Sequence, residues 1–182
     1  MTLRPALFLD RDGVINIDHG YVGDRSRFEF IPGIFALVRR ARALGYLPVV
    51  VTNQSGIARG LFSEEAFFQL TEWMCDRFLQ EGAPLEAVYH CPYHPEAKIE
   101  RWRADHEWRK PRPGMLLAAA NDLSIDLRAS AIIGDKLSDM DAGRAAGLEL
   151  LILVSKLEIF SPSTIKIKSL LEAEEIIFKA ST

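Results

Sequence analysis

Near the start of the chain, residues 6–14 read Ala-Leu-Phe-Leu-Asp-Arg-Asp-Gly-Val, an apolar run that ends in two carboxylates. The apolar residues favour a buried strand, and side chains two positions apart in a strand point the same way. Asp10 and Asp12 can therefore face one site at the carboxyl end of a sheet, where open α/β folds bind their ligands. Acids are also common in turns, so this segment alone leaves a purely structural explanation open.

Short apolar runs alternate with longer amphipathic segments along the rest of the chain. We expect strands at Leu7–Asp10, Pro48–Thr52, Ala87–His90, Ala131–Gly134 and Leu150–Leu153. We expect helices around Ile34–Ala41, from Ser63 to near Gly82, and at Gly114–Leu123, Asp139–Ala146 and Ser169–Lys179. This order predicts one α/β domain over residues 1–182, with a doubly wound parallel sheet. Residues 91–112, rich in proline and aromatic side chains, are expected to form a long loop.

The composition narrows the class of protein. The chain has 182 residues, of which 48% are hydrophobic and 26% charged, which is typical of a globular domain and not of a disordered one. A net charge of −3 gives no general basic surface for nucleic acid. Two cysteines cannot form a disulfide framework, and no apolar stretch reaches membrane-spanning length. We therefore expect a cytoplasmic, monomeric protein that binds neither membrane nor nucleic acid.

Four polar segments follow predicted strands or precede a predicted helix. They are Asp10-Arg11-Asp12-Gly13, Thr52-Asn53-Gln54-Ser55, Arg109-Lys110-Pro111, and Gly134-Asp135-Lys136 with Asp139. Their order and spacing resemble the haloacid dehalogenase superfamily of aspartate-nucleophile phosphatases. The additional segments Asp18-His19-Gly20-Tyr21, Ile31-Pro32-Gly33 and Cys91-Pro92 resemble the D-glycero-D-manno-heptose 1,7-bisphosphate phosphatases and the related histidinol-phosphate phosphatases. The resemblance spans roughly residues 7–155 and implies a fold without a separate cap domain.

The resemblance also implies roles for the motif residues. Asp10 would be the nucleophile that forms an aspartyl-phosphate, and Asp12 the general acid and base. Mg²⁺ would be held by the carboxylates of Asp10 and Asp135 and the backbone carbonyl of Asp12. Thr52 and Lys110 would hold the phosphoryl oxygens. Asp139 would either orient the groups that bind the metal, without binding it directly, or cap the following helix, and we favour the first role.

Substrate contacts are expected from three parts of the chain. The loop at Asp18, His19, Gly20 and Tyr21 would bind the substrate, with side chains that hydrogen-bond to sugar hydroxyls. Asn53, Gln54 and Ser55 follow the threonine motif, and Arg109 and Lys136 stand beside the catalytic motifs. An arginine in that position could grip a second phosphate, although an exposed ion pair would explain it equally well.

The sequence departs from the family in the long loop, where many relatives bind a structural zinc ion. Tyr93, His106 and Trp108 replace three of the four usual ligands and leave only Cys91. Because a structural zinc site needs four ligands, we expect aromatic packing and no zinc.

Several functions remain possible at this point. The leading hypothesis is a Mg²⁺-dependent phosphatase that removes the 7-phosphate of a heptose 1,7-bisphosphate. The alternative is a histidinol-phosphate phosphatase. A nucleic-acid 3′-phosphatase and a phospholigand-binding module without catalytic activity agree less well, because the chain lacks a basic surface and carries every catalytic group.

Overall fold

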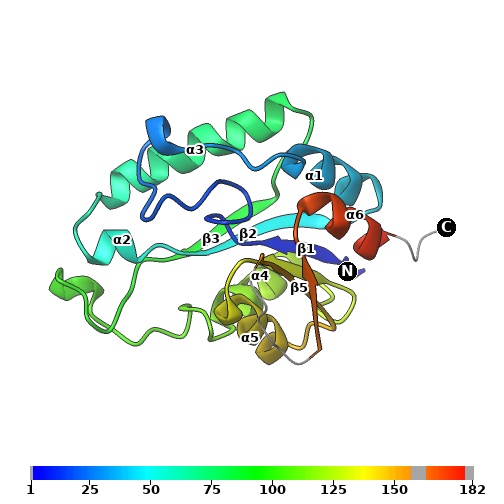
Figure 1. The fold of residues 1–182 in the computed structure, drawn as a ribbon. Coiled ribbons are helices and arrows are strands. Elements are labelled where there is room, and N and C mark those ends of the chain that lie inside the picture. The colour runs from blue at the N-terminus through cyan, green and yellow to red at the C-terminus, as the bar shows by residue number, and fades with distance from the viewer. Residues whose placement is uncertain (1, 157–162, 179–182) are drawn as a thin grey trace.

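The computed structural model describes residues 2–156 and 163–178. Six parallel strands form one sheet in the order β3-β2-β1-β4-β5-β6 (Figure 1). The strands are β1 (Ala6–Leu9), β2 (Leu47–Asn53), β3 (Ala87–Cys91), β4 (Ala131–Gly134), β5 (Leu150–Val154) and β6 (Thr164–Ile167). The predicted doubly wound parallel sheet is confirmed. All five expected strands are present, and each of their ends lies within one residue of the expected position.

Helices cover both faces of the sheet. They are α1 (Ile34–Ala43), α2 (Ser55–Ala58), α3 (Glu64–Gln80), α4 (Gly114–Leu123), α5 (Leu137–Ala146) and α6 (Leu170–Phe178). In Figure 1, α1, α3 and α6 lie on one side of the strands, and α4 and α5 lie on the other. The helices expected from the sequence are all present, although Lys179, the expected end of the last one, lies outside the described residues.

The core is divided by the sheet into two clusters. Leu7 and Leu9 of β1 pack in the cluster with α1, α3 and α6, whereas Ala6 and Phe8 pack in the cluster with α4 and α5. This alternation follows from the twofold side-chain period of a strand. A strand that is buried on both faces needs the continuous apolar run that β1 carries. None of the described helices is long and apolar enough to cross a membrane.

Strand order determines where a site can form. β1 lies between β2 and β4, and the chain winds outward in both directions from this central strand. In such sheets the crevice for a ligand opens at the carboxyl ends of the strands where the order reverses. Asp10 follows β1, Thr52 and Asn53 end β2, and Asp135 follows β4, so the predicted motifs meet at this edge.

Candidate active site

Asp10 and Lys110 form a buried ion pair at the centre of the site. Lys110 Nζ lies 2.9 Å from Asp10 Oδ1 and 2.6 Å from an oxygen of Asp139, and it donates a hydrogen bond to the Val51 carbonyl at 2.7 Å. The backbone N–H of Arg11 also donates to Asp10 Oδ1. Burial raises the pKa of Asp10 even though Lys110 opposes this. Burial lowers the pKa of Lys110, but the charges of Asp10 and Asp139 outweigh it and raise that pKa overall.

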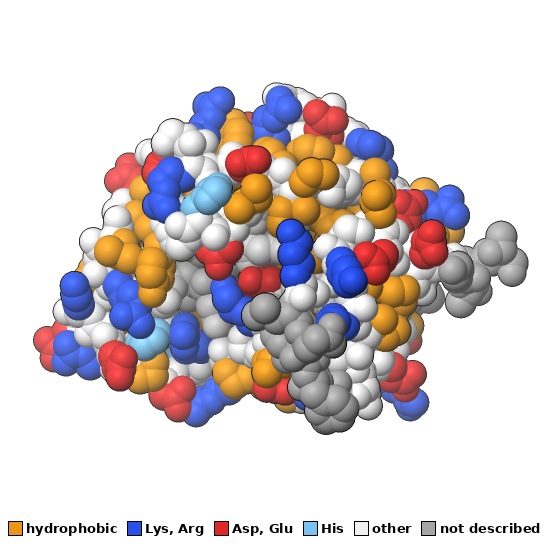
Figure 2. All heavy atoms as spheres, in the orientation of Figure 1, with side chains coloured by type: hydrophobic (Ala, Val, Ile, Leu, Met, Phe, Trp, Pro, Cys, Tyr) orange, Lys and Arg blue, Asp and Glu red, His pale blue; other side chains and the backbone are white. Residues whose placement is uncertain are grey.

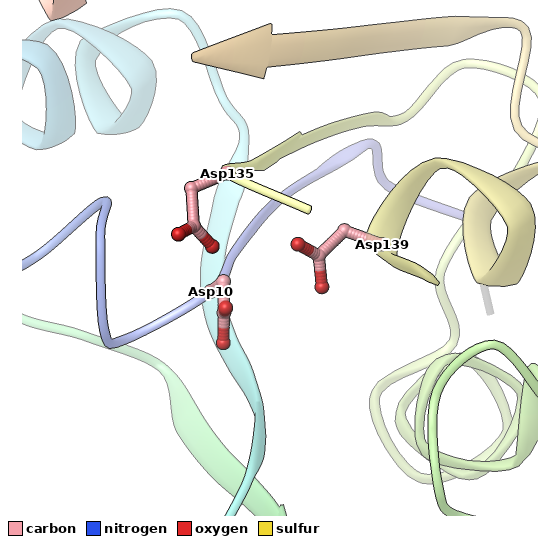
Figure 3. A group of neighbouring side chains, drawn as sticks. All are labelled: Asp10, Asp135 and Asp139. Carbon is pink, nitrogen blue, oxygen red and sulfur yellow. The ribbon is translucent and has the colours of Figure 1, made fainter. Parts of the chain in front are cut away.

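Asp10, Asp135 and Asp139 bring carboxylate oxygens within 4.8 Å of one another. Figure 3 shows the three side chains converging from the ends of β1 and β4 and from the first turn of α5. Asp135 Oδ1 is buried without a hydrogen-bond partner, and burial together with the charge of Asp10 raises the pKa of Asp135 to about 7. A divalent cation would relieve this repulsion, and hard oxygen donors are the ligands that Mg²⁺ prefers.

Gly13 allows the backbone after Asp12 to lie close against the Asp135 carboxylate. Its φ is +90°, and a Cβ there would stand 2.4 Å from Asp135 Oδ2. Only glycine can therefore bring the backbone after Asp12 against the Asp135 carboxylate. The donor set and this cradle fit a small cation, which Asp10 and Asp135 would hold together with the backbone at Asp12.

Asp139 has two contacts that explain its burial. It accepts a hydrogen bond from the backbone N–H of Lys136 at 3.0 Å, which caps the start of α5, and it pairs with Lys110. Both roles considered from the sequence are therefore compatible with its position, since it caps the helix and also lies beside Asp10 and Asp135.

The pKa of Asp135 predicts how metal binding depends on pH. Because its folded-state value is raised from 3.8 to about 7, the metal-free protein loses stability as pH rises from about 4 to about 7. Mg²⁺ competes with the proton, so its affinity should fall up to about tenfold per pH unit below pH 7. We expect the Mg²⁺-induced rise in Tm to be small near pH 5.5 and to level off above about pH 7.5. Thermal melts at fixed Mg²⁺ measure this.

The matched control for that experiment is Asp141→Asn, which removes an exposed carboxylate of α5 that pairs with Arg144. It should leave the pH dependence of the Tm shift unchanged, whereas Asp135→Asn should abolish the shift. A shift of equal size at both pH values in the natural protein would contradict the assignment.

The Asp12 carboxylate is held by side chains from three directions. Arg11 donates from Nε and Nη2 at 3.0–3.2 Å, Asn16 Nδ2 donates at 3.0 Å, and Gln54 Nε2 donates at 2.9 Å. The sequence predicted Asp12 as a functional residue but gave no part to Arg11 or Asn16. Both side chains are fully buried, which is unusual for polar residues. This burial, visible only in the structure, indicates that Arg11 and Asn16 belong to the site.

Residues at the end of β2 and just after it position Thr52 and Lys110, the groups expected to bind phosphate. Gln54 Nε2 donates to Thr52 Oγ1 at 2.9 Å as well as to Asp12. Asn53 exchanges two hydrogen bonds of 3.0 Å with the backbone of Lys110, one from each direction. These bonds join motifs 57 residues apart, so the lysine is fixed relative to β2.

A pocket of about 560 Å³ opens over these groups. Figure 2 shows a hollow on this face, with acidic and basic side chains close together around it. The lining residues are Asp12, Asp18, Gly20, Tyr21, Asn53, Gln54, Ser55, Gly56, Arg109, Lys110, Pro111, Lys136 and Ser138. All but one of the expected substrate contacts are among them. Gly56, Pro111 and Ser138 line the pocket in addition and were not predicted.

His19 is the exception among the expected contacts. It does not line the pocket, and its Nε2 lies 3.8 Å from a carboxylate oxygen of Glu29. Its neighbour Asp18 bridges to Lys136 at 3.1 Å and accepts from the Gly20 N–H at 2.9 Å. This pair connects the loop to the start of α5 at the pocket wall.

The long loop is packed by aromatic rings. The rings of Tyr93 and His106 stack with centroids 4.2 Å apart and planes 5° from parallel, and Trp102 lies edge-on to Tyr93 at 5.1 Å. His106 Nδ1 accepts from the Trp108 N–H, and Arg109 Nη1 donates to the Tyr93 carbonyl. Tyr93, His106 and Trp108 thus contact one another in series, and the Tyr93 carbonyl holds the side chain of Arg109.

Comparisons with known proteins agree with this site. A family model described as HAD-hydrolase-like matches residues 107–163. A D-glycero-alpha-D-manno-heptose-1,7-bisphosphate 7-phosphatase from Burkholderia mallei is 54% identical over 82% of this chain and 79% of its own. A D-glycero-beta-D-manno-heptose-1,7-bisphosphate 7-phosphatase from Vibrio cholerae is 51% identical over 83% of this chain and 81% of its own.

A solved structure supports the same grouping. The D,D-heptose 1,7-bisphosphate phosphatase from B. bronchiseptica, complexed with magnesium and phosphate, superposes with a TM-score of 0.83 at 28% identity and covers 97% of this chain and 99% of its own. The fold and the acidic site therefore define a HAD-like hydrolase. Within that class, identities above 50% over most of the chain place it in the heptose-1,7-bisphosphate 7-phosphatase family.

Proposed function

We propose that this protein is a Mg²⁺-dependent phosphatase that removes the 7-phosphate of a D-glycero-D-manno-heptose 1,7-bisphosphate. The observation that carries the proposal is the buried Asp10, paired with Lys110 and grouped with Asp135 at the switch point of the sheet. The family relationship supports the choice of substrate. The bound metal would neutralise charge between the phosphate and the carboxylates that hold it.

The residues divide the reaction into two balanced steps. Asp10 Oδ2, which accepts no hydrogen bond in the described part of the chain, attacks phosphorus, and the bond to the sugar oxygen breaks as Asp12 donates its proton to that oxygen. Water then attacks phosphorus and gives its proton to Asp12, and the bond to Asp10 breaks. Lys110 and Thr52 stabilise the charge on the phosphoryl oxygens in both steps.

The experiment that tests the proposal is phosphate release from a panel of substrates. It contains both anomers of the heptose 1,7-bisphosphate, fructose 1,6-bisphosphate and histidinol phosphate. We expect the highest kcat/KM with one anomer of the heptose compound. A higher value with histidinol phosphate would favour the alternative function.

Arg109 is proposed to recognise the second phosphate of the substrate. It lines the pocket, it is half-buried, and within the described residues it has no carboxylate partner within ion-pair distance. Arg109→Ala should lower kcat/KM about 100-fold on the bisphosphate but less than about threefold on a small aryl phosphate. Steady-state kinetics with both substrates measure the difference.

The control for that variant is Arg112→Ala, because Arg112 is a nearby exposed arginine that pairs with Asp105 outside the pocket. It should change neither value. Equal losses on both substrates in Arg109→Ala would show a general structural role instead.

We also propose that the loop at 91–112 is stable without zinc. Among the described residues, the three aspartates are the only group of three or more metal-binding side chains close enough to share an ion. The stack of Tyr93 on His106 supports aromatic packing, in place of zinc, as what stabilises the loop.

Trp108→Ala should lower activity about tenfold, because Arg109 would be held less firmly at the substrate pocket, with no change in metal content. Stoichiometric zinc by elemental analysis, lost together with activity in Cys91→Ser, would refute the proposal.

A further inference from the structure

Arg11 is a buried arginine that the two chemical steps do not use. Its side chain is 1% exposed, and it is the largest of the fully buried side chains in the described structure. The ring centroids of Phe28 and Phe67 lie 5.9 and 5.8 Å from its guanidinium carbon. Burying a guanidinium is costly unless it is paired, so a position of this kind indicates a specific task.

The contacts of Arg11 define that task. Its Nε and Nη2 both donate to the Asp12 carboxylate, and the same Nη2 donates to the Val22 carbonyl at 2.6 Å. Val22 directly follows the pocket-lining residues Gly20 and Tyr21. One planar group therefore joins the acid/base carboxylate to the backbone of the loop that lines the substrate pocket.

The planar fork explains why arginine stands here. Two parallel N–H groups fix the rotation of a carboxylate, which a lysine ammonium cannot do. Asn16 and Gln54 each contribute only one further contact to Asp12. Without Arg11, the carboxylate would keep hydrogen bonds but lose its fixed plane and its connection to the loop.

We propose that Arg11 is a positioning residue that orients the Asp12 carboxylate for proton transfer and makes that orientation depend on the loop at 18–22. This inference rests on the proposed phosphatase function. In the first step the proton passes from Asp12 to the leaving sugar oxygen as the phosphorus–oxygen bond breaks. In the second step Asp12 takes a proton from water. Arg11 contacts neither substrate nor water in this account and acts through Asp12 alone.

The test compares a reaction that needs proton donation with one that does not. Nitrophenolate is a stable leaving group, so its release in the first turnover of 4-nitrophenyl phosphate needs no acid. Arg11→Lys should keep this first-turnover rate within about threefold of the natural protein. It should lower kcat on the heptose bisphosphate about 30-fold with KM little changed, since general acid catalysis contributes about 10²–10⁴-fold. Arg11→Met should behave in the same way.

A double-mutant cycle separates positioning from a general structural role. In the Asp12→Asn background, Arg11→Lys should cost less than about twofold further, because its effect passes through the side chain already removed. Arg128→Gln, which breaks an exposed ion pair with Glu149, is the matched control and should change nothing. Circular dichroism melts check that each variant is folded.

Two results would overturn the inference. If Arg11→Lys lowers first-turnover nitrophenolate release as much as sugar-phosphate turnover, Arg11 only maintains the fold. The same conclusion follows if Arg11→Lys lowers kcat as much in the Asp12→Asn background as in the natural protein. Failure of the proposed function looks different, because the natural protein itself would then not turn over the heptose bisphosphate.

Discussion

Asp10→Asn is expected to lower kcat by about 10⁴-fold or more while leaving the fold intact. An amide oxygen is too weak a nucleophile to form the covalent intermediate, and the two-step route has no substitute for it. The fold should survive because Lys110 keeps its contact with Asp139 and because one of three mutually repelling carboxylates is neutralised. Steady-state kinetics and a thermal melt on the same preparation measure both parts.

Asp12→Asn provides the contrast to that variant. It keeps the nucleophile and removes the acid, so it should still form phosphoenzyme from substrates with good leaving groups. Trapping with a fluoride phosphate mimic, or borohydride reduction followed by mass spectrometry, reports the modified residue. Modification at any residue other than Asp10 would contradict the mechanism.

Lys110→Met is expected to damage both stability and activity. The Lys110 side chain is 1% exposed and its ammonium is shared by Asp10 and Asp139, so its removal leaves buried carboxylates without a compensating charge. Breaking a buried pair in this way typically costs about 3–5 kcal/mol of unfolding free energy. Activity should fall about 10³-fold through loss of a charge on the phosphoryl oxygens. Urea unfolding without Mg²⁺ measures the first effect.

Mg²⁺ should restore part of the lost stability in Lys110→Met, because it can compensate the same carboxylates. Lys98→Met, at an exposed position of the long loop, is the control and should unfold at the natural midpoint. An unchanged midpoint in Lys110→Met would mean that Asp10 and Asp139 do not need this lysine.

Much of the fold could be predicted because its central strands are buried on both faces. The apolar runs at β1, β2 and β4 are continuous for that reason, and they stand out in the sequence. β6 was missed because this edge strand reads Thr-Ile-Lys-Ile and is half exposed, so its pattern is weak. α2 was missed because four residues are too few to show a helical period.

The site was predictable where the chemistry itself restricts the residue type. Asp10, Asp12 and Asp135 stand next to strand ends, and the carboxylates of Asp10 and Asp135 lie close together in the fold. Arg11 was missed because strand alternation points it away from the two aspartates. The Arg11 guanidinium reaches the Asp12 carboxylate because the side chain is long and is packed between Phe28 and Phe67, which are distant in the sequence. The position of His19 beside Glu29 likewise depends on how the loop closes.

The central claim is that the enzyme removes the 7-phosphate from a sugar that carries two phosphates. ³¹P NMR of the product made from D-glycero-D-manno-heptose 1,7-bisphosphate in the presence of Mg²⁺ tests it most directly. We expect inorganic phosphate to appear together with one remaining sugar phosphate coupled to the anomeric proton, and no reaction in Asp10→Asn. A remaining phosphate coupled to the protons at C7, or a bisphosphate that stays intact, would contradict the claim.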